Sequence, residues 1–300
     1  MPLSAIGGAS AGGEYKLVDF GGGRKLERFG PWLIDRPSPA AEGFHRALAE
    51  SYWKVAAAHY EREGEDERAG NWIAHGGMPE RWSQSFVAGF TLELKRTAFG
   101  HLGVFPEQAE NWNWIRSQAE SLRGEETPPQ VLNLFAYTGA STLAAAAGGA
   151  AVVHVDSAAN TVAWARRNAE LSQLSGAPIR WLVEDALKFA RRELARGRQY
   201  DGVILDPPSY GHSPQGKPWK LEQQLDELLS ICGQLTAGRR RFMLLTCHTP
   251  GFGPQELAQR MERTVDATTF GNMKVEAADL CLETPDGRRL ASGAMARCSV

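Results

Sequence analysis

Short apolar runs alternate with helix-like segments along the second half of the chain. Each run has four to six residues and is rich in Val, Ile, Leu and Phe, which is typical of strands buried on both faces of a sheet. The runs are VLNLF (131–135), VVHV (152–155), IRWLV (179–183), GVILD (202–206) and RFMLLT (241–246). Strands that alternate with helices predict βαβ units, and therefore a parallel sheet covered on both faces.

The segments between these runs carry apolar residues at helical spacing. In 158–171, Val162, Ala165 and Ala169 share one helical face. A longer stripe follows in 221–235 and consists of Leu221, Leu225, Leu228, Leu229, Cys232 and Leu235. The last segment, 273–300, instead predicts two strands joined at the turn sequence Pro285-Asp286-Gly287. The predicted α/β fold is a doubly wound, mostly parallel sheet that ends in an antiparallel hairpin.

The first third of the chain gives shorter and more mixed signals. Glycines and prolines interrupt it often, and the alternation in Phe90–Lys95 predicts one half-buried strand. Residues 41–62 are compatible with a helix. We therefore expect a smaller α+β domain over residues 1–105 and a larger domain over residues 106–300.

Composition narrows the class of protein. A net charge of −2 and a pI of about 6.4 give no support to a strongly basic nucleic-acid-binding domain. Small basic clusters remain candidates for local contacts: Arg24-Lys25, Lys95-Arg96, Arg191-Arg192 and Arg239-Arg240-Arg241. The four cysteines show no metal-ligand spacing, and no run approaches the roughly 18 apolar residues of a membrane span. Without a secretion signal in its first residues, the chain is expected to be cytoplasmic, reduced and free of structural metal.

Ligands of doubly wound sheets bind at the carboxyl ends of the strands, so the strand ends carry the candidate chemistry. The first strand ends in FAYTGAST (135–142), where Gly139 precedes a helix. A glycine there lets backbone N–H groups approach a carboxylate or phosphate. The single glycine does not match the G-x-G-x-x-G pattern of dinucleotide sites. An ordinary strand–helix turn is the alternative.

Acidic residues follow the next two strands. Asp156 lies at the end of the second strand, where a carboxylate can accept hydrogen bonds from ribose hydroxyls. Glu184 or Asp185 at the end of the third strand can accept one from an adenine amine, with Ala186 as a backbone contact. Each aspartate is also a good helix N-cap, and the two roles are compatible.

Taken together, these strand ends identify a family. The segments VLNLFAYTGAST, VVHVDSAANTVAWARRNAELS, VEDALKFA, DPPSYG and LLTCHTPG resemble the class I S-adenosylmethionine-dependent methyltransferases. They are similar in particular to the bacterial group of 23S ribosomal RNA large-subunit methyltransferases, which modify cytosine carbon 5 or guanine nitrogen 7. This resemblance implies a seven-stranded, Rossmann-like methyltransferase sheet and S-adenosyl-L-methionine as the cofactor. The RNA-binding PUA-type module of some members is not evident in this chain.

The resemblance also assigns residues to parts of the cofactor. The loop after the first strand would line the methionine part and consists of Phe135, Ala136, Tyr137, Thr138 and Gly139. Asp156 and Ser157 would hold the ribose, while Asp185 and Ala186 would contact the adenine. Asp206 would lie beside the methyl-bearing end.

The segment DPPSYG (206–211) is the expected substrate platform. Two prolines fix φ near −65° and hold the Pro207 carbonyl in place. In amine methylation by related enzymes, the acidic side chain and this carbonyl accept hydrogen bonds from the target amine, and an aromatic residue stacks on the base. Asp206, Pro207 and Tyr210 take these roles here. Because Ser209 intervenes, either Ser209 or Tyr210 meets the base.

Cys247 is the candidate nucleophile for a different target atom. Methylation of cytosine at carbon 5 needs a thiolate that adds to carbon 6. Cys247 ends the fifth long strand, and the neighbouring His248 would help to lower its pKa, although adjacent strand residues point opposite ways. The hypothesis is that Cys247→Ala abolishes methylation while donor binding persists.

The sequence thus predicts an S-adenosylmethionine-dependent methyltransferase for a base of RNA, with ribosomal RNA as the first expectation. One alternative is methylation of a protein or small-molecule amine, which the slight overall acidity favours. A second alternative is a nucleotide-binding oxidoreductase with a Rossmann-like sheet. Gln108, which precedes the first long strand, is a further candidate for contact with donor or substrate.

Overall fold

The computed structural model describes residues 15–63, 70–124, 127–211, 218–236, 242–265 and 274–299. By its internal contacts the chain forms two compact units. The first unit comprises 1–87, 91–107 and 281–291, and the second comprises 88–90, 108–280 and 292–300. The tip of the terminal hairpin therefore belongs to the first unit, whereas the sequence placed it in the second domain.

The first unit is built on a five-stranded sheet with strand order β1-β2-β3-β4-β5. Its strands are β1 (Lys16–Gly21), β2 (Arg24–Phe29), β3 (Trp32–Pro37), β4 (Ala58–Arg62) and β5 (Gly70–Ala74). The pair β3 and β4 is parallel, and the other neighbours are antiparallel. Two short helices, η2 (Pro39–Ala41) and α1 (Glu50–Lys54), connect β3 to β4. A separate hairpin pairs β6 (Arg81–Phe86) with β7 (Phe90–Lys95).

Two local predictions for this region had opposite outcomes. The alternation in Phe90–Lys95 is confirmed, because every second residue of β7 is buried. The helix expected over residues 41–62 is wrong for most of its length, since only Glu50–Lys54 is α-helical. Residues 58–62 form β4 instead, and β4 hydrogen-bonds to β3 and β5. Sheet pairing has outweighed the local helical pattern there.

The second unit contains the predicted seven-stranded sheet, with strand order β10-β9-β8-β11-β14-β16-β15. The strands are β8 (Gln130–Leu134), β9 (Ala151–Asp156), β10 (Ile179–Val183), β11 (Gly202–Leu205), β14 (Phe242–Cys247), β15 (Glu276–Glu283) and β16 (Arg289–Ser299). The five strands from β10 to β14 are parallel, and β16 joins β14 in the antiparallel sense. Each of the five predicted apolar runs coincides with a strand to within one residue at either end. The strand order reverses between β8 and β11, which is where such sheets open a ligand crevice.

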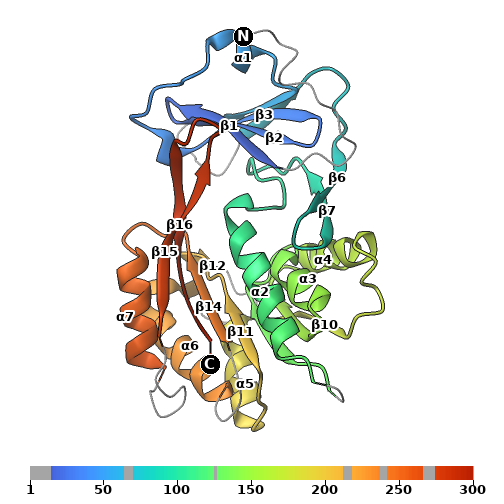
Figure 1. Ribbon diagram of the computed structural model, residues 1–300, viewed down its shortest axis with the longest axis vertical. Helices are drawn as coiled ribbons and strands as arrows, with labels where there is room; N and C mark the ends of the chain where they lie inside the picture. Colours follow the sequence, from blue (N-terminus) through green and yellow to red (C-terminus); the bar gives the residue numbers. More distant parts are fainter. Residues whose placement is uncertain are drawn as a thin grey trace. The chain divides into compact units, whose positions relative to one another are not determined.

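Helices lie on both faces of this sheet (Figure 1). They are α2 (Ala109–Ser121), α3 (Ala140–Ala147), α4 (Ala159–Leu171), α5 (Ala186–Ala195), α6 (Leu221–Leu235) and α7 (Pro254–Thr264). A short hairpin of β12 (Tyr210–Gly211) and β13 (Trp219–Lys220) precedes α6. No helix within the described ranges is long and apolar enough to cross a bilayer.

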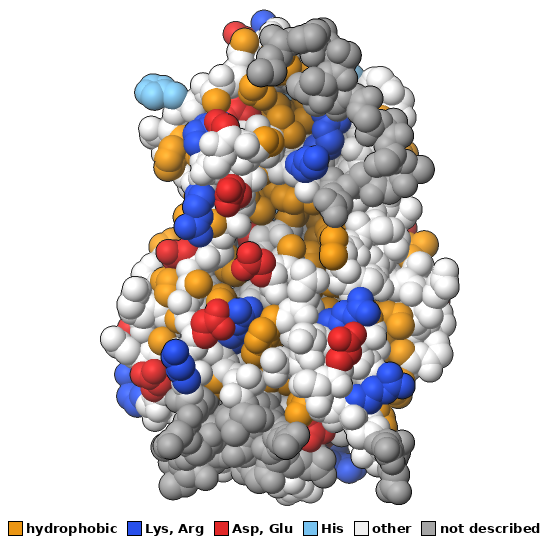
Figure 2. All heavy atoms as spheres, viewed as in Figure 1, with side chains coloured by type: hydrophobic (Ala, Val, Ile, Leu, Met, Phe, Trp, Pro, Cys, Tyr) orange, Lys and Arg blue, Asp and Glu red, His pale blue; other side chains and the backbone are white. Residues whose placement is uncertain are grey.

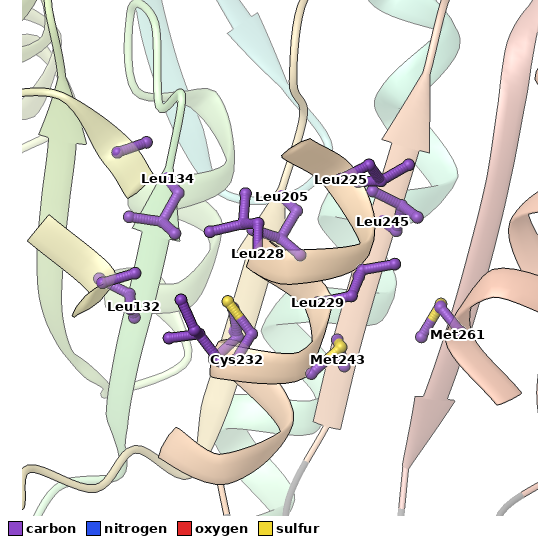
Figure 3. Packing of buried hydrophobic residues seen from close by; sticks show 14 of the residues in the cluster. Leu132, Leu134, Leu205, Leu225, Leu228, Leu229, Cys232, Met243, Leu245 and Met261 are labelled. Carbon is purple, nitrogen blue, oxygen red and sulfur yellow. The ribbon is translucent and has the colours of Figure 1, made fainter. Parts of the chain in front are cut away.

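The main core lies between the sheet and α5, α6 and α7. The predicted stripe on α6 is confirmed, since all six of its residues are buried in this cluster. Figure 3 shows Leu225, Leu228 and Leu229 of α6 beside strand side chains such as Leu205 and Leu245. Alternate strand residues face the other side, where Phe242 meets Trp114 of α2 at a ring distance of 5.5 Å. Burial on both faces fixes the register of each strand.

Candidate active site

The loop after β8 has a strained backbone. Phe135 and Tyr137 have φ angles of 55° and 49°, in the left-handed region that non-glycine residues rarely adopt, and Gly139 follows at 92°. Tertiary contacts hold this conformation: the Ala136 N–H donates to the Val155 carbonyl at 3.0 Å, and the Asn168 side chain donates to the Thr138 carbonyl at 2.8 Å. Strain of this kind gathers at ligand sites because it positions backbone groups in advance.

Gly139 allows α4 to pack closely under this loop. A Cβ atom at Gly139 would lie 3.1 Å from the Ala165 Cβ, and 3.7 Å from the Cε1 of His154. His154 is fully buried, and burial, followed by the charge of Arg166, lowers its pKa to about 3. The neutral ring contacts Thr142 of α3, which also takes a hydrogen bond from Asn133 of β8. Gly139 is therefore needed for two reasons: it adopts the positive φ of the turn, and it leaves room for α4 to contact the loop.

Asp156, at the end of β9, faces the same loop. Its Oδ2 accepts the Tyr137 N–H and its Oδ1 accepts the Ala158 N–H, both at 2.9 Å. Burial raises the pKa of the carboxyl, although both N–H groups act in the opposite direction. The N-cap of α4 is Ala158, so Asp156 is not the cap residue itself. Ser157 is exposed beside it.

At the end of β10, Asp185 is a helix cap. It is the N-cap of α5 and accepts the Lys188 N–H at 2.8 Å, which leaves its second oxygen for another donor. Glu184, the alternative candidate, forms a two-point ion pair with Arg192, at 2.9 and 2.6 Å. Ala186 is buried. Of the two acids, Asp185 therefore stays the better candidate for an adenine contact.

The segment after β11 is held in place by hydrogen bonds. The Pro208 carbonyl accepts the Trp219 indole N–H at 2.7 Å, and the Ser209 hydroxyl contacts the Thr249 hydroxyl at 2.6 Å. The Tyr210 side chain is 45% exposed. A flat base stacks on an aromatic ring, so the exposed Tyr210 is a better candidate for stacking than Ser209. The Phe135 ring lies 5.0 Å from the Trp219 ring and so joins this segment to the loop after β8.

Asp206 is the centre of a polar cluster. Its Oδ1 accepts the Thr246 hydroxyl at 2.7 Å and lies 3.6 Å from the Nε2 of His248. The same Nε2 is 3.5 Å from the amide nitrogen of Gln108, whose oxygen accepts from Asn111 at 2.7 Å. The sequence noted Gln108 and His248 without assigning them to Asp206. The signal that could have connected them is the position of His248, which follows β14, the neighbour of the strand that precedes Asp206.

Cys247 lies on the other side of β14. It is 1% exposed and belongs to the apolar cluster, while Thr246 and His248 point to Asp206. Burial raises the pKa of its thiol, and the charge of Asp206 acts in the same direction. From the sequence we predicted that His248 lowers the pKa of Cys247, so the shift of this pKa is opposite in direction to the prediction. A buried thiol with a raised pKa is a poor nucleophile, which argues against the predicted role.

Within the ranges that the structure describes, no three His, Cys, Asp or Glu side chains come together as metal ligands would. The chain matches the profile of the S-adenosylmethionine-dependent methyltransferases over residues 48–289. It belongs to this family. Membership overturns the alternative of a nucleotide-binding oxidoreductase and confirms S-adenosylmethionine as the cofactor of the reaction.

Relatives of two kinds support the assignment. A solved S-adenosylmethionine-dependent methyltransferase from Agrobacterium tumefaciens is 33% identical and has a TM-score of 0.87, covering 97% of this chain and 92% of that one. Ribosomal RNA large subunit methyltransferase I of Aeromonas hydrophila is 28% identical over 64% of this chain. Ribosomal RNA large subunit methyltransferase K/L of Shewanella sp. (strain MR-4) is 41% identical over 42% of it. The chain spans only 49% and 17% of the lengths of these two curated relatives.

The groups at the strand ends suit S-adenosylmethionine by their chemistry. The partly buried Asp156 carboxylate has both oxygens oriented and keeps lone pairs for ribose hydroxyls. The strained loop leads into the N-terminus of α3, whose first N–H groups suit the carboxylate of the methionine part. When bound, S-adenosylmethionine supplies a methyl group on a positively charged sulfur. The assignment of single residues to parts of the cofactor stays a prediction.

Proposed function

We propose that this methyltransferase modifies a nitrogen atom of a base in ribosomal RNA. The observation that carries the proposal is the pair of acceptors at the end of β11. The Asp206 carboxylate is held by Thr246, and the Pro207 carbonyl takes no hydrogen bond from the residues that the structure describes. Groups that only accept select a partner that donates N–H, as an amine of a base does.

The surroundings of Cys247 support nitrogen over carbon as the target. Carbon 5 of cytosine needs a thiolate, and the thiol of Cys247 is buried with a raised pKa. A base nitrogen needs only orientation and a destination for one proton. Asp206 and Pro207 would orient the N–H group, and the exposed Tyr210 ring would stack on the flat base.

RNA as the substrate class rests on the relatives. Both curated relatives named above are ribosomal RNA large subunit methyltransferases, and the longer of the two alignments covers 64% of this chain. Action on ribosomal RNA would place the protein in the cytoplasm. The protein's own residues would bind the base, exclude water and accept its proton at Asp206.

The charge distribution favours the second candidate, an amine of a protein or small molecule. Acidic and basic side chains are interspersed on the face shown in Figure 2. Of the predicted basic clusters, Arg24 and Lys25 pair with Asp35 and Glu27, and Arg191 and Arg192 pair with Glu227 and Glu184. The cluster 239–241 lies outside the described residues. Paired arginines release fewer counterions from RNA than free ones.

Nucleoside analysis of ribosomal RNA from a strain that lacks this protein tests the proposal. We expect one nitrogen-methylated nucleoside to disappear and to return with the native chain but not with Asp206→Ala. Asp226→Ala, which changes an aspartate on α6, is the matched control and should restore the modification. Unchanged RNA, with labelled methyl groups in protein or small molecules, would refute the RNA substrate. Loss of a carbon-methylated cytidine would instead favour the thiol route.

A further inference from the structure

His248 presents one nitrogen to the Asp206 carboxylate and has its other nitrogen fixed. The Nδ1 of the ring lies 2.6 Å from the Ser292 carbonyl of β16. A carbonyl oxygen only accepts, so Nδ1 must carry a hydrogen. If the ring is neutral, Nε2 then carries no hydrogen and can only accept a hydrogen bond.

The amide of Gln108 favours the neutral ring. Its oxygen is occupied by the Asn111 side chain at 2.7 Å, so its NH₂ group faces the Nε2 of His248 at 3.5 Å. An NH₂ group opposite Nε2 requires a lone pair on that nitrogen. Two independent partners, Ser292 and Gln108, therefore select the same tautomer of the ring.

The position of the ring is built into β16. Gly293 has a φ of 146°, and a Cβ atom there would lie 2.7 Å from the Nδ1 of His248 and 2.8 Å from the Cys247 carbonyl. A larger residue would push the ring out of reach of Asp206. The contacts of the ring include the charged Asp206, directly after β11, and two neutral groups, the Ser292 carbonyl of β16 and the amide of Gln108.

Asp206 Oδ1 and His248 Nε2 lie 3.6 Å apart. In the neutral tautomer selected by Ser292 and Gln108, these two atoms are both acceptors, with no hydrogen between them. We propose that this pair takes up the single proton released during methyl transfer, and that His248 is its final acceptor. The inference deepens the proposed function and rests on a nitrogen as the methyl acceptor. It makes His248 a positioning and proton-accepting residue that acts through Asp206.

The proton balance requires such an acceptor. The base nitrogen forms a bond to the methyl carbon while the bond from that carbon to the sulfonium sulfur breaks, and the electron pair of the broken bond stays on sulfur. The nitrogen then carries the positive charge and releases one proton to Asp206. Imidazole is a stronger base than a carboxylate, so the proton moves on to Nε2. The product is an imidazolium–carboxylate ion pair, which strengthens as the two groups approach.

His248→Asn is the main test, because the asparagine amide can still donate to the Ser292 carbonyl but cannot take up a proton. With saturating donor and RNA from a strain lacking this protein, we expect the single-turnover rate to fall by about 100-fold. Donor affinity, measured by calorimetry, should stay unchanged. The native rate should decline as pH falls and the ring becomes protonated, and the variant should lack this decline. His75→Asn, in an exposed position after β5, is the matched control.

Added imidazoles separate proton acceptance from a structural role. In His248→Ala, the rescued rate should rise with the pKa of the added imidazole, and Asp206→Asn should show no rescue. A loss in His248→Asn of less than about tenfold, or a rescue that ignores imidazole pKa, would overturn the inference.

The state of the ring is measurable without any substrate. Nitrogen-15 NMR of the native chain should show a neutral ring with hydrogen on Nδ1 and none on Nε2 at neutral pH. Gln108→Glu should raise the pKa of His248, because a carboxylate opposite Nε2 stabilises the imidazolium. A hydrogen on Nε2 in the native chain would mean that both amides are turned over, and this result alone would refute the inference. If the ring is as expected but native protein leaves the RNA unmodified, the proposed function fails instead.

Discussion

The carboxylate of Asp156 accepts the backbone N–H of Tyr137 at 2.9 Å and so ties the end of β9 to the strained loop after β8. One acid thereby orients the loop, and we predict that its remaining lone pairs accept hydrogen bonds from the ribose of the donor. Asp156→Ala removes both functions. A hydrogen bond to a charged group contributes about 1.5–3 kcal/mol, so donor affinity should fall by roughly 10–100-fold in calorimetry. Asp226→Ala should bind as the native chain does, and an equal loss there would contradict the assignment.

The pH dependence of donor binding follows from the same residue. Burial raises the pKa of Asp156 above 3.8, so acidification protonates this carboxyl at a higher pH than an exposed aspartate. Donor affinity should therefore fall as pH is lowered through the raised pKa. The stability of the ligand-free protein changes with pH in the opposite direction. Because the folded state holds the proton of Asp156 more tightly, stability decreases as pH rises from the pKa of the unfolded state through the raised pKa of the folded state. Calorimetry and thermal unfolding at a series of pH values measure the two effects, and an affinity independent of pH would argue against the ribose role.

Replacement of Cys247 distinguishes the two chemistries. Since its thiol is buried and its pKa is raised, Cys247→Ala should keep most of the methylation activity. The cost should appear in stability, at about 1 kcal/mol, because an apolar contact is lost from the main core. Single-turnover methylation and chemical denaturation measure the two quantities. Abolished activity with intact donor binding would restore the nucleophile hypothesis.

Gly139 should tolerate no side chain. Alanine there would take a φ of 92° and place its Cβ 3.1 Å from the Ala165 Cβ, so α4 and the loop must separate. Gly197→Ala is a control that isolates the backbone effect, because Gly197 also has a positive φ but no atom within 4 Å of the added Cβ. We expect a loss of about 1 kcal/mol for Gly197→Ala and a larger loss for Gly139→Ala, with weaker donor binding in the latter alone. Equal losses in denaturation would show that the contact with Ala165 is unimportant.

The sequence predicted the second unit better than the first for a physical reason. Strands such as β8 and β11 are buried on both faces, so their apolar runs and their ends are visible in the sequence. The strand β4 was missed because its pairing with β5 depends on residues further along the chain, and its own pattern fits a helix. Local periodicity carries no information about such partners.

The candidate site divides in a similar way. Asp156 ends β9 and Asp206 directly follows β11, so the parallel topology places both at the same edge of the sheet. The partners of His248 come from segments far apart in the sequence, with Gln108 before the sheet and Ser292 in its last strand. The side of β14 on which Cys247 lies was equally hidden, since every residue of that strand is buried. No alternation of apolar and polar residues marked its two faces.

In the first unit, Asp19 offers a stability test that is independent of the active site. This fully buried carboxylate accepts hydrogen bonds from Phe20, Ala47, Leu48, the Trp53 indole and the Arg288 guanidinium of the hairpin tip. Burial alone would raise its pKa, but these donors, Arg288 first among them, bring the pKa below 3.8. The stability that this site contributes is therefore fully present above the pKa of Asp19 in the unfolded state. It is lost as pH falls through the lower pKa of the folded state.

Arg288→Ala leaves the carboxylate of Asp19 buried without its charged partner. Removing one partner of a buried ion pair costs roughly 3–5 kcal/mol, which should appear as a lower denaturation midpoint at neutral pH. Arg289→Ala changes the adjacent arginine at the exposed start of β16 and should have little effect. The difference between the two variants should shrink in acid, as Asp19 becomes protonated in both. A difference that persists unchanged at low pH would show that Arg288 stabilises the unit by packing on Phe20, over which its guanidinium lies at 4.7 Å, and not by its charge.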